Sequence, residues 1–200
     1  MEQYVITISR QFGSMGRSIA KELSENLGIE FLDRDIVEAT AKRMGLPVSV
    51  ISDEEESMKS TFFRRQYPLG MGMSSLKDEI FYTQKNIIRD FAAKGSCIIV
   101  GRCADYALAD EPHCLNIFIR SNMDDRIKRI SERLNVPENK AKDIIKKKDK
   151  ERSSYYNYYT SKKWGDARSY DLCLNTSQIS VEDSIELILK YRECMRSHNK

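Results

Sequence analysis

The stretch "ISRQFGSMGRSIAKEL", residues 8–23, decides how the rest of the chain is interpreted. It continues the apolar, β-branched run of residues 4–8, passes through a short loop containing Gly13 and Gly16, and enters a helical pattern with its apolar side chains on one face. A strand, a glycine-containing loop and a helix in this order are typical of a phosphate-binding loop, where backbone N–H groups surround phosphate oxygens.

The stretch differs from the usual pattern G-x-x-x-x-G-K-[ST] at two positions. Gln11 stands at the first glycine and Arg17 at the lysine, whereas Ser18 keeps the hydroxyl that normally binds Mg²⁺. We expect Gly13 and Gly16 to supply positive φ angles. Arg17 can hold phosphate in a bidentate manner, but it is longer and planar and is not equivalent to a compact lysine charge. A tight strand-to-helix turn without a ligand is the alternative.

The length and composition are those of a single soluble, globular domain of ordinary size. The chain has 200 residues, of which 40% are hydrophobic and 32% charged. There is no run of eighteen apolar residues, so we expect no membrane span, and the first residues lack a signal-peptide pattern. Five cysteines without paired spacing, only two histidines and the absence of C-x-x-C predict reduced thiols, no zinc site and a cytoplasmic location.

Positive charge is concentrated in one segment. The net charge is only +3, but residues 126–168 contain 14 Lys and Arg against 6 Asp and Glu. A basic segment in a nearly neutral chain indicates a local anionic ligand. The small net charge gives no independent reason to expect nucleic-acid binding.

Short apolar runs alternate with helical patterns along the chain. We predict strands at residues 4–8, 29–32, 97–100, 115–119 and 170–174, and helices at 15–27, 33–45, 75–94, 103–109, 123–134, 137–158 and 181–196. Residues 46–75 are less regular and are interpreted as a helical insertion ending in a mobile Gly/Met loop. The alternation predicts a single α/β domain with a parallel sheet covered on both faces.

Polar clusters follow several of the predicted strands. They are the loop at 11–18, "DRD" at 33–35, "GRCAD" at 101–105 and "RSNMDDR" at 120–126. Because the carboxyl ends of parallel strands share one edge of the sheet, these clusters are expected to surround one ligand site.

The chain resembles the cytidylate kinase-like proteins, a branch of the P-loop nucleoside monophosphate kinases. The resemblance rests on six segments that cover most of the chain in order: "ITISRQFGSMGRSIA", "LDRDIV", "IIVGRCADYAL", "IFIRSNMDDRIKRI", "KKDKERSSYYNYYT" and "WGDARSYDLCLNTS". It implies a P-loop NTPase three-layer sandwich with a five-stranded parallel sheet of order 2-3-1-4-5. A monophosphate-binding insertion would lie at 46–75 and a lid-like segment at about 137–165.

The activity implied by this resemblance is transfer of the γ-phosphoryl group of ATP to a nucleoside monophosphate, typically CMP or dCMP, with Mg²⁺. By matching position, the ATP phosphates would be held by Gln11, Phe12, Gly13, Ser14, Met15, Gly16, Arg17 and Ser18. Gly101-Arg102 resembles the Gly-Arg that binds the monophosphate, although Cys103 replaces the usual aspartate and Asp105 lies nearby. Arg126 and Arg129 resemble arginines that reach toward the transferring phosphates.

Phosphoryl transfer requires positioning and positive charge, and an anionic acceptor phosphate needs no dedicated general base. We therefore expect the catalytic set to be cationic: Arg17, Arg102, Arg126, Arg129, Lys148 and Arg152. Lys148 and Arg152 are four residues apart and share a helix face. The alternative for the 140–152 charge run is a solvated helix surface, and Arg126 and Arg129 could equally be exposed.

Other side chains have two interpretations. Asp33 could bind the substrate or, like Asp35, support Mg²⁺ through water, but Asp33 also suits a helix N-cap. Tyr155, Tyr156 and Tyr159 lie near the Lys148–Arg152 face and are expected chiefly to pack, as is Trp164. The cysteines have no catalytic partner, and Cys97 and Cys173 fall in predicted buried strands.

Three other functions are compatible with these residues. A nucleotide-binding protein with little transfer activity would explain Gln11, Arg17 and the lack of an acid after residues 97–100. A kinase for a different small acceptor is the second. Nucleic-acid binding is the third, but aromatic residues are not interleaved over an exposed sheet, and steep salt dependence would be required. The sequence does not determine the oligomeric state.

Overall fold

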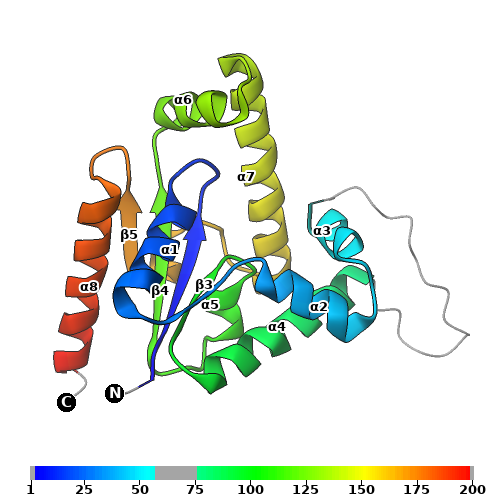
Figure 1. Ribbon diagram of the computed structural model, residues 1–200, viewed down its shortest axis with the longest axis vertical. Helices are drawn as coiled ribbons and strands as arrows, with labels where there is room; N and C mark the ends of the chain where they lie inside the picture. Colours follow the sequence, from blue (N-terminus) through cyan, green and yellow to red (C-terminus); the bar gives the residue numbers. More distant parts are fainter. Residues whose placement is uncertain (1–2, 57–75, 199–200) are drawn as a thin grey trace, which may run out of the picture.

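The computed structural model describes residues 3–56 and 76–198. In chain order the elements are β1 (Val5–Arg10), α1 (Gly16–Leu27), β2 (Glu30–Leu32), α2 (Asp35–Met44), α3 (Val48–Glu56), α4 (Leu76–Lys94), β3 (Cys97–Val100), α5 (Ala104–Ala107), β4 (Cys114–Arg120), α6 (Met123–Leu134), α7 (Glu138–Thr160), the 3-10 turn η1 (Ala167–Ser169), β5 (Leu172–Asn175) and α8 (Val181–His198). Figure 1 shows their arrangement. In these ranges no helix is both long and apolar enough to cross a membrane.

The described strands form one parallel sheet in the order β2-β3-β1-β4-β5. β1 is central: its Val5 lies opposite Cys97 of β3 and Cys114 of β4, and its last residue, Arg10, lies opposite Ile119. The predicted sheet order is therefore confirmed. All five strands end at the same edge, so the loops that follow them meet there.

Two hydrophobic layers cover the two faces of the sheet, as predicted for a three-layer sandwich. Side chains alternate between the faces along each strand, so that Ile6 and Ile8 of β1 pack with α1 and α8, whereas Val5 packs with α2, α4 and α5. Both layers consist mainly of fully buried isoleucine, leucine and valine. The central strands are buried on both faces, which explains their continuous apolar runs.

The helices α6 and α7 form a separate pair beyond the carboxyl ends of the strands (Figure 1). They pack together through Ile130, Ala141 and Ile145, and Phe12 from the loop after β1 contacts the same cluster. The C-terminal half of α7 extends toward α5, where Tyr155, Tyr156 and Tyr159 pack with Phe81 and Tyr106. This pair places the basic segment 126–168 over the edge where the strands end.

Several element boundaries differ from the predictions. The helix predicted at 103–109 is the single turn α5, and the last strand begins at Leu172, two residues later than predicted. The turn η1 at 167–169 precedes it, with the Asp166 side chain accepting from the Arg168 N–H. α2 begins at Asp35, with Arg34 at the N-cap, so the predicted capping role of Asp33 is wrong. The helical start of the insertion is α3, and residues 57–75 of that prediction lie outside the described residues.

The cysteines divide into two groups. Cys97, Cys103 and Cys114 are buried, whereas Cys173 and Cys194 are exposed. The prediction that Cys173 is buried is wrong because β5 is an edge strand. Burial raises the pKa of the Cys97 and Cys114 thiols to about 12, and also raises that of Cys103. These three side chains therefore remain neutral thiols that act as small apolar groups.

Candidate functional site

The loop between β1 and α1 presents an uncapped helix N-terminus to a cleft of about 560 Å³. Its N-cap residue is Met15, which adopts a left-handed conformation with φ 64° and makes no side-chain capping bond. The first N–H groups of any helix lack an intrahelical acceptor, so those of α1 are available to phosphate oxygens. All the residues predicted to hold ATP phosphates, 11–18, line this cleft.

The glycines of the loop have different roles. Gly13 has φ 80°, as expected, but positive φ at Gly16 was predicted wrongly, since Met15 has it instead. Gly16 is required by space: a Cβ there would lie 2.7 Å from the Cβ of Arg10 and 3.3 Å from that of Ile119. The loop and the end of β4 therefore approach each other too closely for a side chain at position 16.

Gln11 replaces the first glycine of the usual pattern without a positive φ. Its N–H donates to the Ile119 carbonyl at 3.0 Å, and its side-chain Oε1 accepts from the Ser121 N–H at 3.1 Å. The Ser14 hydroxyl lies 2.9 Å from the Gln11 carbonyl and 3.1 Å from that of Ile119. These bonds fasten the loop to the end of β4.

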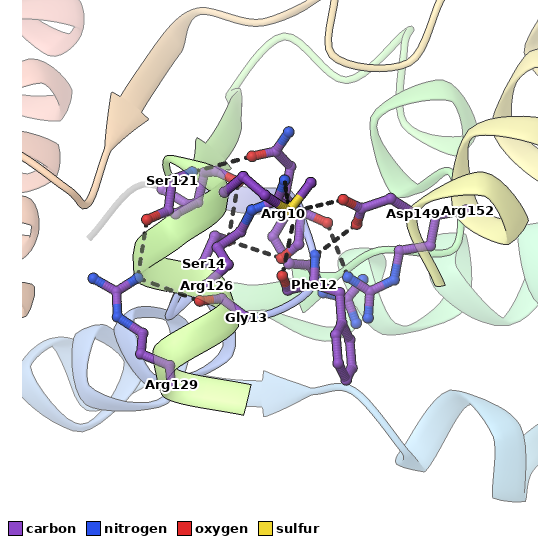
Figure 2. A network of polar contacts seen from close by, with 12 residues as sticks. Arg10, Phe12, Gly13, Ser14, Ser121, Arg126, Arg129, Asp149 and Arg152 are labelled. Atoms are coloured by element: carbon purple, nitrogen blue, oxygen red, sulfur yellow. Dashed lines mark hydrogen bonds and ion pairs between the residues drawn. The ribbon is translucent and has the colours of Figure 1, made fainter. Parts of the chain in front are cut away.

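Arg126 of α6 contacts the loop and is joined to it through Asp149 (Figure 2). It is only 4% exposed and forms an ion pair with Asp149 of α7, whose other carboxylate oxygen accepts from the Phe12 N–H at 2.7 Å. Arg126 also lies 3.4 Å from the Phe12 carbonyl. The sequence placed this arginine among exposed or phosphate-directed side chains, but it is buried and does not line the large cleft.

Arg129 connects three of the loops that follow strands. Its guanidinium donates to the Gly13 carbonyl at 3.3 Å and to Ser121 Oγ at 3.0 Å (Figure 2). It also donates to the Thr176 carbonyl at 3.0 Å. The Thr176 hydroxyl in turn donates to the Ser14 carbonyl at 3.0 Å. Arg129 also borders the large cleft, and its hydrogen bonds fix the position of the loop at 11–18.

The arginine at the lysine position of the motif is directed toward the end of β2. Arg17 Nε donates to Oδ2 of Asp33 at 2.6 Å, and its guanidinium lies 5.7 Å from the Phe31 ring centroid. The Arg17 side chain remains 59% exposed, whereas Asp33 is buried. Asp33 thus binds a cation of the loop, which is the structural reason that it does not cap α2.

Arg10, which belongs to no motif in the sequence, is the second cation at Asp33, with 3.8 Å between its Nη2 and Oδ1 of Asp33. It ends β1 and its side chain is 19% exposed. Burial, together with the positive charges of Arg152, Arg102 and Arg17, lowers the pKa of Arg10 to about 9, against which Asp33 acts. A charged residue at the end of a mainly buried central strand was the available signal.

A second cleft of about 210 Å³ adjoins the first. It brings together three of the predicted catalytic residues: Arg102, Lys148 and Arg152. Arg102 follows β3 in a left-handed conformation with φ 55°, and its Nε lies 3.4 Å from the Asp33 carbonyl. Arg152 donates to the Arg10 carbonyl at 3.0 Å and stands over the Phe12 ring (Figure 2). Burial is the main cause that lowers the pKa of Arg152.

Asp105 occupies a different environment from the one expected of a substrate-binding residue. It is 6% exposed and accepts a 2.6 Å hydrogen bond from the Tyr156 hydroxyl. Burial raises its pKa above the ordinary value, although the Tyr156 hydrogen bond acts in the opposite direction. Asp105 lines neither of the two clefts. The structure thus places it in the interior beneath α7.

The tyrosines of α7 mainly pack, as predicted. Tyr159 stacks on Phe81 with ring centroids 3.9 Å apart, and Tyr156 is buried in the same cluster. Tyr155 also borders the smaller cleft. Trp164 packs edge-on against Phe118 at 5.3 Å, so it contributes to the cover of the sheet.

The side chains fit a Mg²⁺ ion that is held chiefly by nucleotide phosphates. Ser18 lies in the first turn of α1 and borders the large cleft, so its hydroxyl can supply one oxygen ligand. In residues 3–56 and 76–198 no three His, Cys, Asp or Glu side chains are grouped as a metal site. Such a cage is not required, because Mg²⁺ usually keeps several waters and binds substrate phosphates with one or two protein oxygens.

Comparisons with known proteins agree with this geometry. The model of the cytidylate kinase-like family matches residues 5–178. The chain is 27% identical over 186 residues to a cytidylate kinase from Sulfolobus acidocaldarius, covering 92% of this chain and 91% of the relative. An uncharacterised protein from Eubacterium ventriosum has a similar structure, with TM-score 0.73, 32% identity and coverage of 96% and 99%. A shikimate kinase from Bacteroides thetaiotaomicron, 13% identical with TM-score 0.56 and coverage of 96% and 99%, shares the P-loop kinase fold.

Proposed function

The chain belongs to the cytidylate kinase-like family, and from this premise we propose that it transfers the γ-phosphoryl group of ATP to a nucleoside monophosphate, most favourably CMP or dCMP. The observation that carries the proposal is the pair of adjoining cationic clefts, which share Arg10 and Arg152. Two anionic substrates that bind in adjoining clefts can exchange a phosphoryl group without either leaving the protein.

The larger cleft is assigned to ATP. The amides at the start of α1 would hold the β- and γ-phosphates, and Arg17 would lie at the mouth of the cleft. Arg126 and Arg129 act through the loop, because their guanidinium groups bind its carbonyls and Asp149. Ser18 would be one ligand of a bound Mg²⁺ ion, which would neutralise part of the phosphate charge.

The smaller cleft is assigned to the acceptor monophosphate. Arg102 and Lys148 lie at its wall and supply positive charge for a dianionic phosphate, and Arg152 faces both clefts. α7 carries Lys148 and Arg152, so we propose that about 137–165 acts as the lid and that α3 begins the monophosphate-binding insertion. An oxygen of the acceptor phosphate attacks the γ-phosphorus, and the bond from that phosphorus to the β–γ bridging oxygen breaks, leaving ADP.

The test is an ADP-release assay with ATP and Mg²⁺ against CMP, dCMP, UMP and AMP. Lys148→Met should raise the acceptor KM by about tenfold because a charge-assisted contact is lost. Lys146→Met, on the exposed side of the same helix, is the matched control and should leave the KM unchanged.

Failure of this test has a specific meaning. If ATP binds in calorimetry while none of the four acceptors supports turnover, the assignment of a nucleoside monophosphate kinase is wrong. If turnover occurs but Lys148→Met and Lys146→Met behave alike, the smaller cleft is not the acceptor site.

A further inference from the structure

Arg10 stands where the two clefts meet. It is the last residue of the central strand. Among the described residues, Arg10 and Arg152 are the two that line both clefts. Arg152 reaches this point from α7 and is fixed there by its bond to the Arg10 carbonyl. Arg10, in contrast, extends from the sheet itself, which is the part of the fold least able to move relative to the phosphate loop.

The backbone on both sides leaves room for the Arg10 side chain. A Cβ at Gly16 would lie 2.7 Å from Arg10 Cβ and 3.1 Å from its Cγ. A Cβ at Gly101 would collide with the Arg10 guanidinium, and Gly101 also has φ 78°. One glycine therefore accommodates the stem of the arginine and the other its charged end, so the site is built around this side chain.

Among the described residues, the charges that act most strongly on Arg10 are mainly positive. Arg152, Arg102 and Arg17 each disfavour its protonated form, and Asp33 is the carboxylate that opposes them. That carboxylate lies 3.8 Å from Arg10 but 2.6 Å from Arg17, so its shorter contact is with the other arginine. An anion between the two clefts would supply the compensating charge that Arg10 lacks.

Arg17 is not placed for this role. Its Nε is held at Asp33, its guanidinium lies over Phe31, and more than half of its side chain is in solvent. Arg10 is also not needed to hold Asp33 in place, because Arg17 makes the closer contact with that carboxylate.

We infer that Arg10, and not the arginine at the lysine position of the motif, contacts the γ-phosphoryl group as it passes from the donor to the acceptor. The inference rests on the proposed function. The acceptor oxygen forms its bond to phosphorus while the bond to the β–γ bridging oxygen breaks, and ADP retains that electron pair. Arg10 donates hydrogen bonds to the equatorial oxygens and transfers neither a proton nor electrons.

The first test compares Arg10→Met with Arg17→Met in the complete chain. Loss of a donor directed at transition-state charge typically lowers kcat by about 100- to 1,000-fold, so Arg10→Met should show such a loss with the acceptor KM nearly unchanged. Arg17→Met should lower kcat by less than about tenfold, because its lost partner is chiefly Asp33. A larger loss for Arg17→Met, or a loss in Arg10→Met that appears only in KM, overturns the inference.

The second test does not depend on turnover, and so separates this inference from the proposed function. A residue that contacts only the γ-phosphoryl group distinguishes ATP from ADP. Arg10→Met should therefore weaken ATP binding in calorimetry by about tenfold and leave ADP binding within about twofold, whereas Arg17→Met should change the two affinities equally. Equal weakening of ATP and ADP in Arg10→Met contradicts the inference even if the wild-type chain phosphorylates CMP.

A folding defect is controlled by the conservative variant. Arg10→Lys keeps the charge and the stem between Gly16 and Gly101 but loses the bidentate geometry. If Arg10→Lys has the thermal unfolding midpoint of the wild type and still loses kcat, the defect lies in the contact with phosphate. If kcat in Arg10→Lys and Arg10→Met follows the unfolding midpoint alone, Arg10 is structural and the inference is wrong.

Discussion

The main-chain N–H of Phe12 donates a 2.7 Å hydrogen bond to Asp149, a residue on α7 that lies 137 positions further along the chain. The same carboxylate is paired with Arg126 of α6, which is buried. One acidic side chain thus joins the phosphate loop, α6 and α7. Through it, the helix that carries Lys148 and Arg152 is held in register with the loop that is assigned to ATP.

Replacing Asp149 with Asn should lower both stability and activity. Arg126 would keep a buried charge without its counter-ion, and breaking a buried pair typically costs about 3–5 kcal/mol in the free energy of unfolding. Urea unfolding measures this change. Asp143→Asn, at an exposed position of the same helix, should change the free energy by less than about 0.5 kcal/mol. Equal effects of the two substitutions would show that the Asp149–Arg126 pair does not secure the loop.

Gly16→Ala should disturb the loop although Ala favours helices. The added Cβ would lie 2.7 Å from Cβ of Arg10, whose position is fixed by the sheet, so the start of α1 must shift. Overpacking of this kind costs about 1–3 kcal/mol, and we expect ATP affinity measured by calorimetry to fall by about tenfold or more. Gly95→Ala is the control because a Cβ there meets nothing within 4 Å. Unchanged ATP affinity in Gly16→Ala would contradict the described packing.

Arg129→Met should loosen three loops together. Its guanidinium bonds the Gly13 carbonyl, Ser121 Oγ and the Thr176 carbonyl, and removing a charged donor leaves buried acceptors unsatisfied at a cost of about 2 kcal/mol. Hydrogen exchange followed by mass spectrometry should show faster exchange in residues 11–18 and 175–178. Lys128→Met, an exposed neighbour, should leave the exchange of these segments as in the wild type. Faster exchange confined to α6 would argue against a connecting role.

Asp105→Asn should reduce the pH dependence of stability. The folded state raises the Asp105 pKa from its ordinary value of 3.8, so the folded chain binds this proton more tightly than the unfolded chain. The contribution of protonated Asp105 to the free energy of unfolding is therefore complete below about pH 4, and it is lost as the pH rises through the pKa of the folded state. The Asn side chain can still accept from Tyr156 but does not ionise. Thermal unfolding between pH 4 and pH 8 should therefore vary less in Asp105→Asn than in the wild type.

The same variant tests the position of Asp105 relative to the substrate. Because Asp105 borders neither cleft, Asp105→Asn should leave the acceptor KM unchanged. Asp110→Asn, whose side chain is 93% exposed, is the control for stability. A raised acceptor KM in Asp105→Asn, or a steeper pH dependence, would show that this carboxylate is active at the site.

The sheet and its covering helices could be predicted because each is encoded locally. Strands buried on both faces need continuous apolar runs, as at 97–100, and helices need one apolar face, as at 15–27. The sheet order, implied by the family resemblance, is confirmed. Boundaries were less predictable where a tertiary contact competes with a local preference. Asp33 has the chemistry of a helix cap, but its pairing with Arg17 determines its position.

The arrangement of the site could be predicted only in part. The residues of the loop, Arg102, Lys148 and Arg152 were identified because they follow strands or share a helix face. The burial of Arg126 could not be predicted, because its partner Asp149 is distant in sequence and both residues lie in helical patterns that also suit a solvated surface. Arg10 was missed because a single charge at a strand end has no periodicity.

The division of the cysteines into buried and exposed thiols gives the chain its own attachment points for spectroscopic probes. A maleimide dye at neutral pH should react with Cys173 on β5 and Cys194 on α8, since the other three thiols are covered and stay protonated. With Cys194 changed to Ser and Lys146 of α7 changed to Cys, the chain carries a donor and an acceptor dye on the sheet and on α7. Energy transfer between these dyes then measures how far α7 moves over the sheet when a nucleotide is added.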